Sequence, residues 1–217
     1  LPWESVLDLA EALAGALQVL HEKKLVYGVM QPDKVMLAGL SPVLIDVRVD
    51  RANTQFRTNR SITSQEMTFW PPEMIDDPNA FSEHADLYSL GATLYTALTG
   101  RTVISGTSLE EVGGNIRFEV PQSPASVVLD CPVWLDKLIM QLLEKDPDDR
   151  PHGAPAVNLA LQEVRRRAMS RTGVAEHVSQ GFSPLNVNDQ KDRDEARILL
   201  GHGALLAEEE KPAETPE

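Results

Sequence analysis

The stretch FSEHADLYSLGATLYTALTG, residues 81–100, decides the fold. Its apolar side chains fall on nearly every side of a helix instead of along one stripe, and Gly100 follows the last of them. A helix that is apolar almost all round lies inside a protein, and glycine is common just past a helix C-terminus. We therefore expect residues 81–100 to form the central helix of the core.

Further helices are predicted on both sides of the central one. From Pro2 to about His21, apolar residues recur mostly at intervals of three and four, which is the spacing of an amphipathic helix. The same spacing predicts helices over 108–115, 133–145 and 155–169. The chain is thus expected to fold as a mainly α domain.

Residues 25–68 have a different pattern. Short runs at 25–27, 35–37 and 43–46 are rich in β-forming residues and are separated by turns, so they predict short strands. The stretch 48–68 is polar with little periodicity and predicts a long exposed loop. Loops of this length are usually functional or disordered.

Composition excludes several classes of protein. The 217 residues carry 20 basic and 33 acidic side chains, a net charge of −13, which argues against a nucleic-acid partner. No apolar run reaches the roughly 20 residues that cross a bilayer, so no transmembrane segment is predicted. The one cysteine, Cys131, cannot form an intramolecular disulfide, and we expect it to pack as a small apolar residue in a cytoplasmic protein.

The helical signal weakens towards the C-terminus. We expect one domain over residues 1–168, a partly helical extension over 169–200 with a short helix at 194–200, and an acidic, disordered tail over 201–217. The chain begins at Leu1, without methionine, and enters a helical pattern at once. This leaves open that the sequence is the later part of a longer protein.

Several segments, in order and spacing, resemble the C-terminal lobe of the Ser/Thr protein kinase family. Residues 25–37 resemble the catalytic loop and residues 44–48 the magnesium-binding L-I-D-F-G. The other matching segments are 71–73, similar to A-P-E, 86–91, similar to D-x-[WY]-S-x-G, 94–100 and 145–151. The resemblance spans about residues 3–165 and implies a kinase-like C-terminal lobe with short strands around the catalytic loop. No glycine-rich loop or V-A-I-K strand is present, so the N-terminal β lobe is expected to be absent from this chain.

The resemblance implies that the groups for phosphoryl transfer have been replaced. Val29 stands where a carboxylate orients the substrate hydroxyl, and a hydrocarbon cannot accept a proton. Lys34 stands at the position of the second metal ligand, where its ammonium group would repel Mg²⁺. Gln31 replaces a lysine, Gly28 an arginine and Tyr27 a histidine. No catalytic residue is therefore expected in this loop.

The resemblance also implies which groups remain. Asp46 stands at the metal-binding position, and two interpretations of it stay open: a residual Mg²⁺ ligand, or a strand-end aspartate that caps a turn. Glu73 and Arg150 are expected to form a buried ion pair. Asp86 is expected to accept hydrogen bonds from the backbone of the catalytic loop.

These replacements favour a catalytically impaired kinase-like domain, a pseudokinase, that binds another protein through residues 48–68 and needs no cofactor. The alternative is an ATP-dependent Ser/Thr protein kinase with an atypical site built on Asp46, using ATP and Mg²⁺, of which this chain is the C-terminal part. A truncated product without a role of its own is a third hypothesis.

Overall fold

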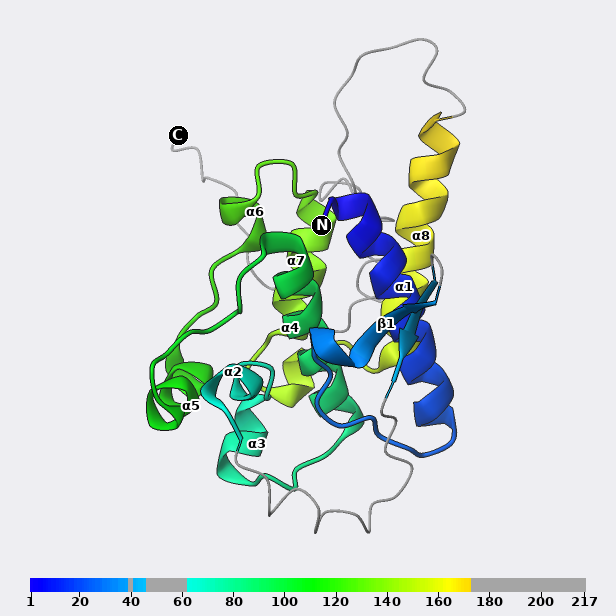
Figure 1. Ribbon diagram of the computed structural model, residues 1–217. Helices are drawn as coiled ribbons and strands as arrows, with labels where there is room; N and C mark the ends of the chain where they lie inside the picture. Colours follow the sequence, from blue (N-terminus) through cyan, green and yellow to red (C-terminus); the bar gives the residue numbers. More distant parts are fainter. Residues whose placement is uncertain (39–40, 46–61, 173–217) are drawn as a thin grey trace, which may run out of the picture.

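The structure is a computed structural model, and it describes residues 1–38, 41–45 and 62–172. Its α-helices are α1 (Trp3–Glu22), α2 (Ser64–Met67), α3 (Pro72–Asp76), α4 (Glu83–Thr99), α5 (Leu109–Phe118), α6 (Pro124–Val127), α7 (Val133–Leu142) and α8 (Ala154–Thr172). Two short 3-10 helices, η1 (Pro32–Lys34) and η3 (Pro147–Asp149), and two strands, β1 (Val35–Ala38) and β2 (Ser41–Leu44), accompany them. The described part is mainly helical, as predicted (Figure 1).

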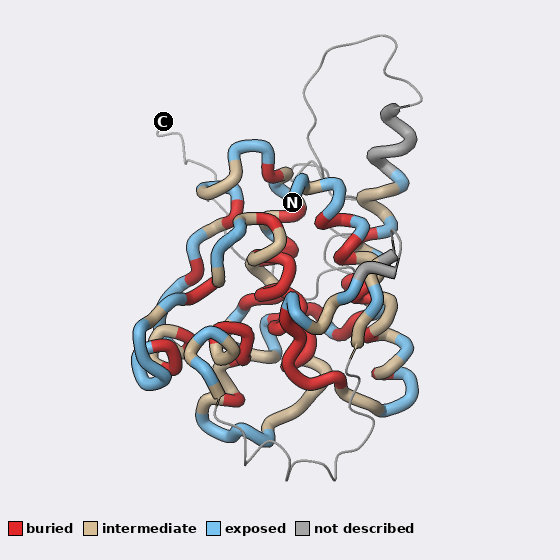
Figure 2. Tube along the Cα trace, viewed as in Figure 1, coloured by how far each residue is buried: buried red, intermediate tan, exposed pale blue. Residues whose placement is uncertain are grey.

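Helix α4 is the centre of the core, which confirms the prediction from residues 81–100. Most of its residues are buried, on every side of the helix (Figure 2). The Ser82 side chain accepts a hydrogen bond from the Ala85 amide at its start, and Gly100 at φ 71° ends it. Local caps at both ends and apolar burial along its length explain why this segment is helical.

Helices α1 and α7 pack directly against α4, and α8 packs along α1. At the α4–α7 contact a Cβ on Gly91 would lie 2.7 Å from Leu142 Cβ, so glycine permits the close approach. Arg165 joins α8 to α1 through ion pairs with Asp8 and Glu11. This packing fixes α1 and α4 relative to each other, and the candidate site lies where they meet.

The two strands form an antiparallel hairpin in which Val35 pairs with Leu44 and Met36 with Val43. The hairpin packs on α1 through β2. The strand predicted over 25–27 is not present: this prediction was wrong because the Tyr27 amide donates to a side chain of α4 instead of a neighbouring strand.

The prediction of a long loop over 48–68 was wrong at the C-terminal end of that stretch, where α2 forms. Thr63 and Glu66 make reciprocal side-chain to backbone bonds, a capping box that holds this single turn. Helices α3 and α6 begin with a proline at their first helical position, which presets the backbone. Apolar periodicity does not detect helices this short.

The structure also bears on Cys131, on the helix ends and on membrane-spanning segments. Cys131 is buried, as expected. Helix α7 ends at Leu142, earlier than the predicted 145, whereas α5 continues to Phe118, past the predicted 115, and α8 to Thr172, past the predicted 169. None of the helices in the described ranges is long and apolar enough to span a membrane. Residues 39–40, 46–61 and 173–217 lie outside the described residues, and with them lie residues 173–200 of the predicted extension and the tail over 201–217.

Candidate functional site

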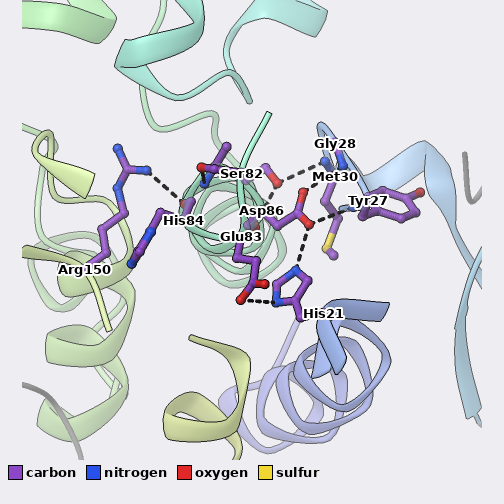
Figure 3. Close-up of polar contacts among 11 residues, drawn as sticks. His21, Tyr27, Gly28, Met30, Ser82, Glu83, His84, Asp86 and Arg150 are labelled. Atoms are coloured by element: carbon purple, nitrogen blue, oxygen red, sulfur yellow. Dashed lines mark hydrogen bonds and ion pairs between the residues drawn. The ribbon is translucent and has the colours of Figure 1, made fainter. Parts of the chain in front are cut away.

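The backbone of residues 27–30 is held against α4 by side chains of that helix (Figure 3). Asp86 Oδ2 accepts a hydrogen bond from the Tyr27 amide and Oδ1 accepts one from the Gly28 amide, both at 2.7 Å. Ser89 Oγ accepts from the Met30 amide at 3.1 Å. Two residues one helical turn apart thus fix the shape of the loop that resembles the kinase catalytic loop.

Asp86 is fully buried, with 0% of its side chain exposed. Burial raises the pKa of this carboxyl, while hydrogen bonds from His21, Tyr27 and Gly28 act in the opposite direction. A buried carboxylate is tolerated when donors surround it, and here it has three. The cluster can therefore keep a charged carboxylate inside the core.

His21, the third donor, was not singled out by the sequence analysis. Its Nε2 lies 2.9 Å from Asp86 Oδ2, and because a carboxylate only accepts, Nε2 is the donor. The available signal was its position: His21 continues the buried face of α1 formed by Leu13 and Leu17. A polar residue on an otherwise apolar helix face needs a buried partner.

Gly28 occupies a backbone conformation that suits glycine. Its φ is 101°, a region that residues with a Cβ adopt at a cost. The Asp86 carboxylate holds the Gly28 amide in this conformation. Glycine therefore fits this position without the backbone strain that a residue with a Cβ would carry.

The remaining loop positions predicted from the sequence lie close together. Val29 and Gln31 are buried, and the Val29 side chain belongs to the hydrophobic core. Lys34 Nζ donates to the Val29 carbonyl oxygen at 3.4 Å. The Tyr27 hydroxyl donates to the Ile45 carbonyl oxygen at 2.7 Å, which ties the loop to the residue before Asp46.

The resemblance implied metal-binding positions at Asp46 and Lys34. Asp46 lies outside the described residues, and Lys34 brings an ammonium group where an oxygen ligand would be required. Within the described ranges no group of three histidine, cysteine, aspartate or glutamate side chains could hold a metal ion.

Glu73 and Arg150 lie in contact at the other end of the site (the arginine is at the left of Figure 3). Arg150 Nη1 and Nη2 each donate to one oxygen of the Glu73 carboxylate at 2.8 Å. The remaining N–H groups donate to the carbonyl oxygens of His84, Glu144 and Lys145. The arginine, 1% exposed, thereby uses all five donors and joins four chain segments.

Sequence similarity to known proteins covers most of this chain. The protein kinase domain family matches residues 2–162. Serine/threonine-protein kinase PknK of Mycobacterium tuberculosis is 29% identical over 169 residues, covering 77% of this chain and 15% of PknK. PknL of the same organism is 26% identical over 167 residues, covering 76% of this chain and 41% of PknL.

PknE, also a serine/threonine-protein kinase of Mycobacterium tuberculosis, is 26% identical over 144 residues, covering 65% of this chain and 25% of PknE. The chain therefore spans between 15% and 41% of the length of these relatives. The family match covers most of the described residues, including the loop and both buried clusters. The chain belongs to the protein kinase domain family and resembles its Ser/Thr kinases.

Proposed function

We propose that this chain is a catalytically impaired kinase-like domain that acts by binding another protein. The observation that carries the proposal is the pair Val29 and Lys34. A buried hydrocarbon side chain stands where the hydroxyl-orienting carboxylate is expected, and the neighbouring ammonium group donates to its carbonyl oxygen. Phosphoryl transfer depends on positioning and charge neutralisation, and this pair supplies neither.

The retained architecture supports the same proposal. The Asp86 contacts and the Glu73–Arg150 ion pair maintain the fold around the loop although the catalytic side chains are replaced. Burying a charged group lowers the stability of the fold unless the group has its partners. The presence of these satisfied charged groups therefore supports a function that depends on a defined loop shape. A shape that no longer supports catalysis can still be recognised by a partner.

We also propose which segment of the chain contacts the partner protein. The polar stretch 48–68 is the proposed contact segment, and its last part leads into the capped turn α2. Helix α2 contacts α5, so this end of the segment is anchored on the helical domain. Residues 48–61 lie outside the described residues.

The test is phosphate transfer from labelled ATP by the natural full-length protein, with Asp46→Ala as the control. We expect the protein and the control to give the same background, on themselves and on a generic basic protein. A parent that labels a substrate, with loss of labelling in Asp46→Ala, would overturn the proposal.

That outcome would support a second candidate, an ATP-dependent Ser/Thr kinase with an atypical site. Two observations favour it: the relatives are named serine/threonine-protein kinases, and the sequence has Asp46 at the metal-binding position. ATP binding separates the candidates further. A ligand at 100 times its Kd stabilises a folded protein by about 2.7 kcal/mol, so thermal unfolding at millimolar ATP and Mg²⁺ would register it.

A further inference from the structure

We propose that Glu83 positions the backbone of Tyr27 and Gly28 from the protein surface, acting through His21 and Asp86. All four contacts of this relay are drawn in Figure 3. The proposal concerns the shape of the loop and holds whether or not the loop takes part in phosphate transfer.

The relay runs from solvent to the core. The Glu83 side chain is 41% exposed, His21 is 4% exposed and Asp86 is not exposed. Glu83 and Asp86 are three residues apart on α4, so they lie on the same face of the helix. The imidazole of His21, contributed by α1, lies between their carboxylates.

The two sides of the imidazole differ. Nε2 donates to Asp86 at 2.9 Å, whereas the buried Nδ1 makes no hydrogen bond within the described part of the chain. The group facing Nδ1 is the Glu83 carboxylate, with Oε2 at 3.8 Å. Because Glu83 is partly exposed, its side chain is the member of the relay that can approach or withdraw.

When the ring carries a proton on both nitrogens, Nδ1 can donate to the Glu83 carboxylate, and this contact would hold the ring in the orientation that serves Asp86. Asp86 in turn holds the amides of Tyr27 and Gly28, the latter at φ 101°. A lysine or arginine side chain of a partner that binds the Glu83 carboxylate would compete with His21. The expected consequence is a less tightly held backbone at Tyr27 and Gly28. The partner that this contact would recognise therefore carries a cationic side chain.

Amide hydrogen exchange on the full chain tests the relay residue by residue. Glu83→Ala should speed exchange at Tyr27 and Gly28 by about 2- to 10-fold, the range that corresponds to the net contribution of one hydrogen bond. The Met30 amide, which Ser89 holds, is the internal reference and should change little. Glu83→Gln, which keeps an acceptor oxygen, should restore part of the protection.

Two control variants separate the relay from a general loosening of the helices. Ser82→Ala removes the cap of α4 without touching His21, and Glu22→Gln changes an exposed acidic residue beside it. Neither should speed exchange at Tyr27 and Gly28 selectively. In a His21→Gln background, Glu83→Ala should have no further effect on these amides.

Three results would overturn the proposal. The first is unchanged exchange at Tyr27 and Gly28 in Glu83→Ala. The second is an equal increase at Met30, which would indicate loosening of the whole loop. The third is an effect of Ser82→Ala equal to that of Glu83→Ala, which would assign the change to the start of α4. If His21→Gln does not fold, the surface variants alone decide between these outcomes.

Discussion

The two buried clusters that meet α4 differ in how completely the hydrogen bonds of Arg150 and of His21 are satisfied. Arg150 uses all five donors, on the Glu73 carboxylate and three carbonyl oxygens, and its guanidinium lies over the Tyr88 ring at 5.1 Å. In the Asp86 cluster, by contrast, the Nδ1 atom of His21 is buried without a hydrogen bond in the described structure.

This difference separates a fixed part of the molecule from an adjustable one. The Arg150 guanidinium has every donor satisfied, although the neighbouring Tyr88 hydroxyl is buried without a hydrogen bond within the described residues, and a charged group held at every donor is rigid. In the Asp86 cluster, the His21 Nδ1 atom without a hydrogen bond among the described residues faces the partly exposed Glu83 carboxylate at 3.8 Å, which is the contact that the proposed relay can make or release. The Arg150 cluster therefore stabilises the fold, and the Asp86 cluster sets the shape of the loop.

The largest expected effect breaks the Arg150 cluster. Glu73→Ala and Arg150→Ala should each destabilise the protein by about 3–5 kcal/mol, because removing one partner leaves a buried charge unpaired. The double variant should cost much less than the sum of the two. Urea unfolding of the four proteins measures this. Single variants within about 0.5 kcal/mol of the parent, the range of ordinary surface substitutions, would contradict the assigned role of this cluster.

A smaller effect is expected at the loop held by the Asp86 cluster. Gly28→Ala should destabilise by about 1–2 kcal/mol, because an L-residue is strained at a φ of 101°. Gly15→Ala is the matched control: Gly15 lies within α1 with no atom within 4 Å of the added Cβ. This control should stabilise by about 0.5–1 kcal/mol, since alanine favours a helix. The same urea experiment should therefore show changes of opposite sign, and a Gly28→Ala variant as stable as the parent would refute the strain argument.

The smallest effect is expected away from both clusters, at the start of α5. Hydrogen bonds from Thr107 lower the pKa of the exposed Glu111 carboxyl. A lowered pKa in the folded state adds stability above the ordinary pKa of the group, and this stability is lost as the pH falls through the lowered value. The small difference in Tm between the parent and Glu111→Gln should therefore be present at pH 6 and disappear near pH 3. A difference that grows as the pH falls would contradict this sign.

The sequence by itself determined the long elements and the family. Helices α1, α4, α5, α7 and α8 were predicted because their apolar residues repeat with the period of a helix, which is a local property. The positions of Val29 and Lys34 also follow from the sequence, because a motif fixes residue order and spacing. The predicted ends of α5, α7 and α8 were less accurate, since neighbouring contacts decide where a helix stops.

The resemblance placed Asp86 against the backbone of the loop, but only the tertiary structure decided which amides it holds and which other side chains join it. The sequence predicted a strand at 25–27, but Asp86, 59 residues away from Tyr27, takes the amide that a strand would have used. The tertiary structure also brings His21 to Asp86, which is 65 residues away in the sequence. The periodicity of a single helix cannot predict such a contact. The physical reason is that a buried donor or acceptor must find its partner wherever packing places it, and packing is settled by the whole chain.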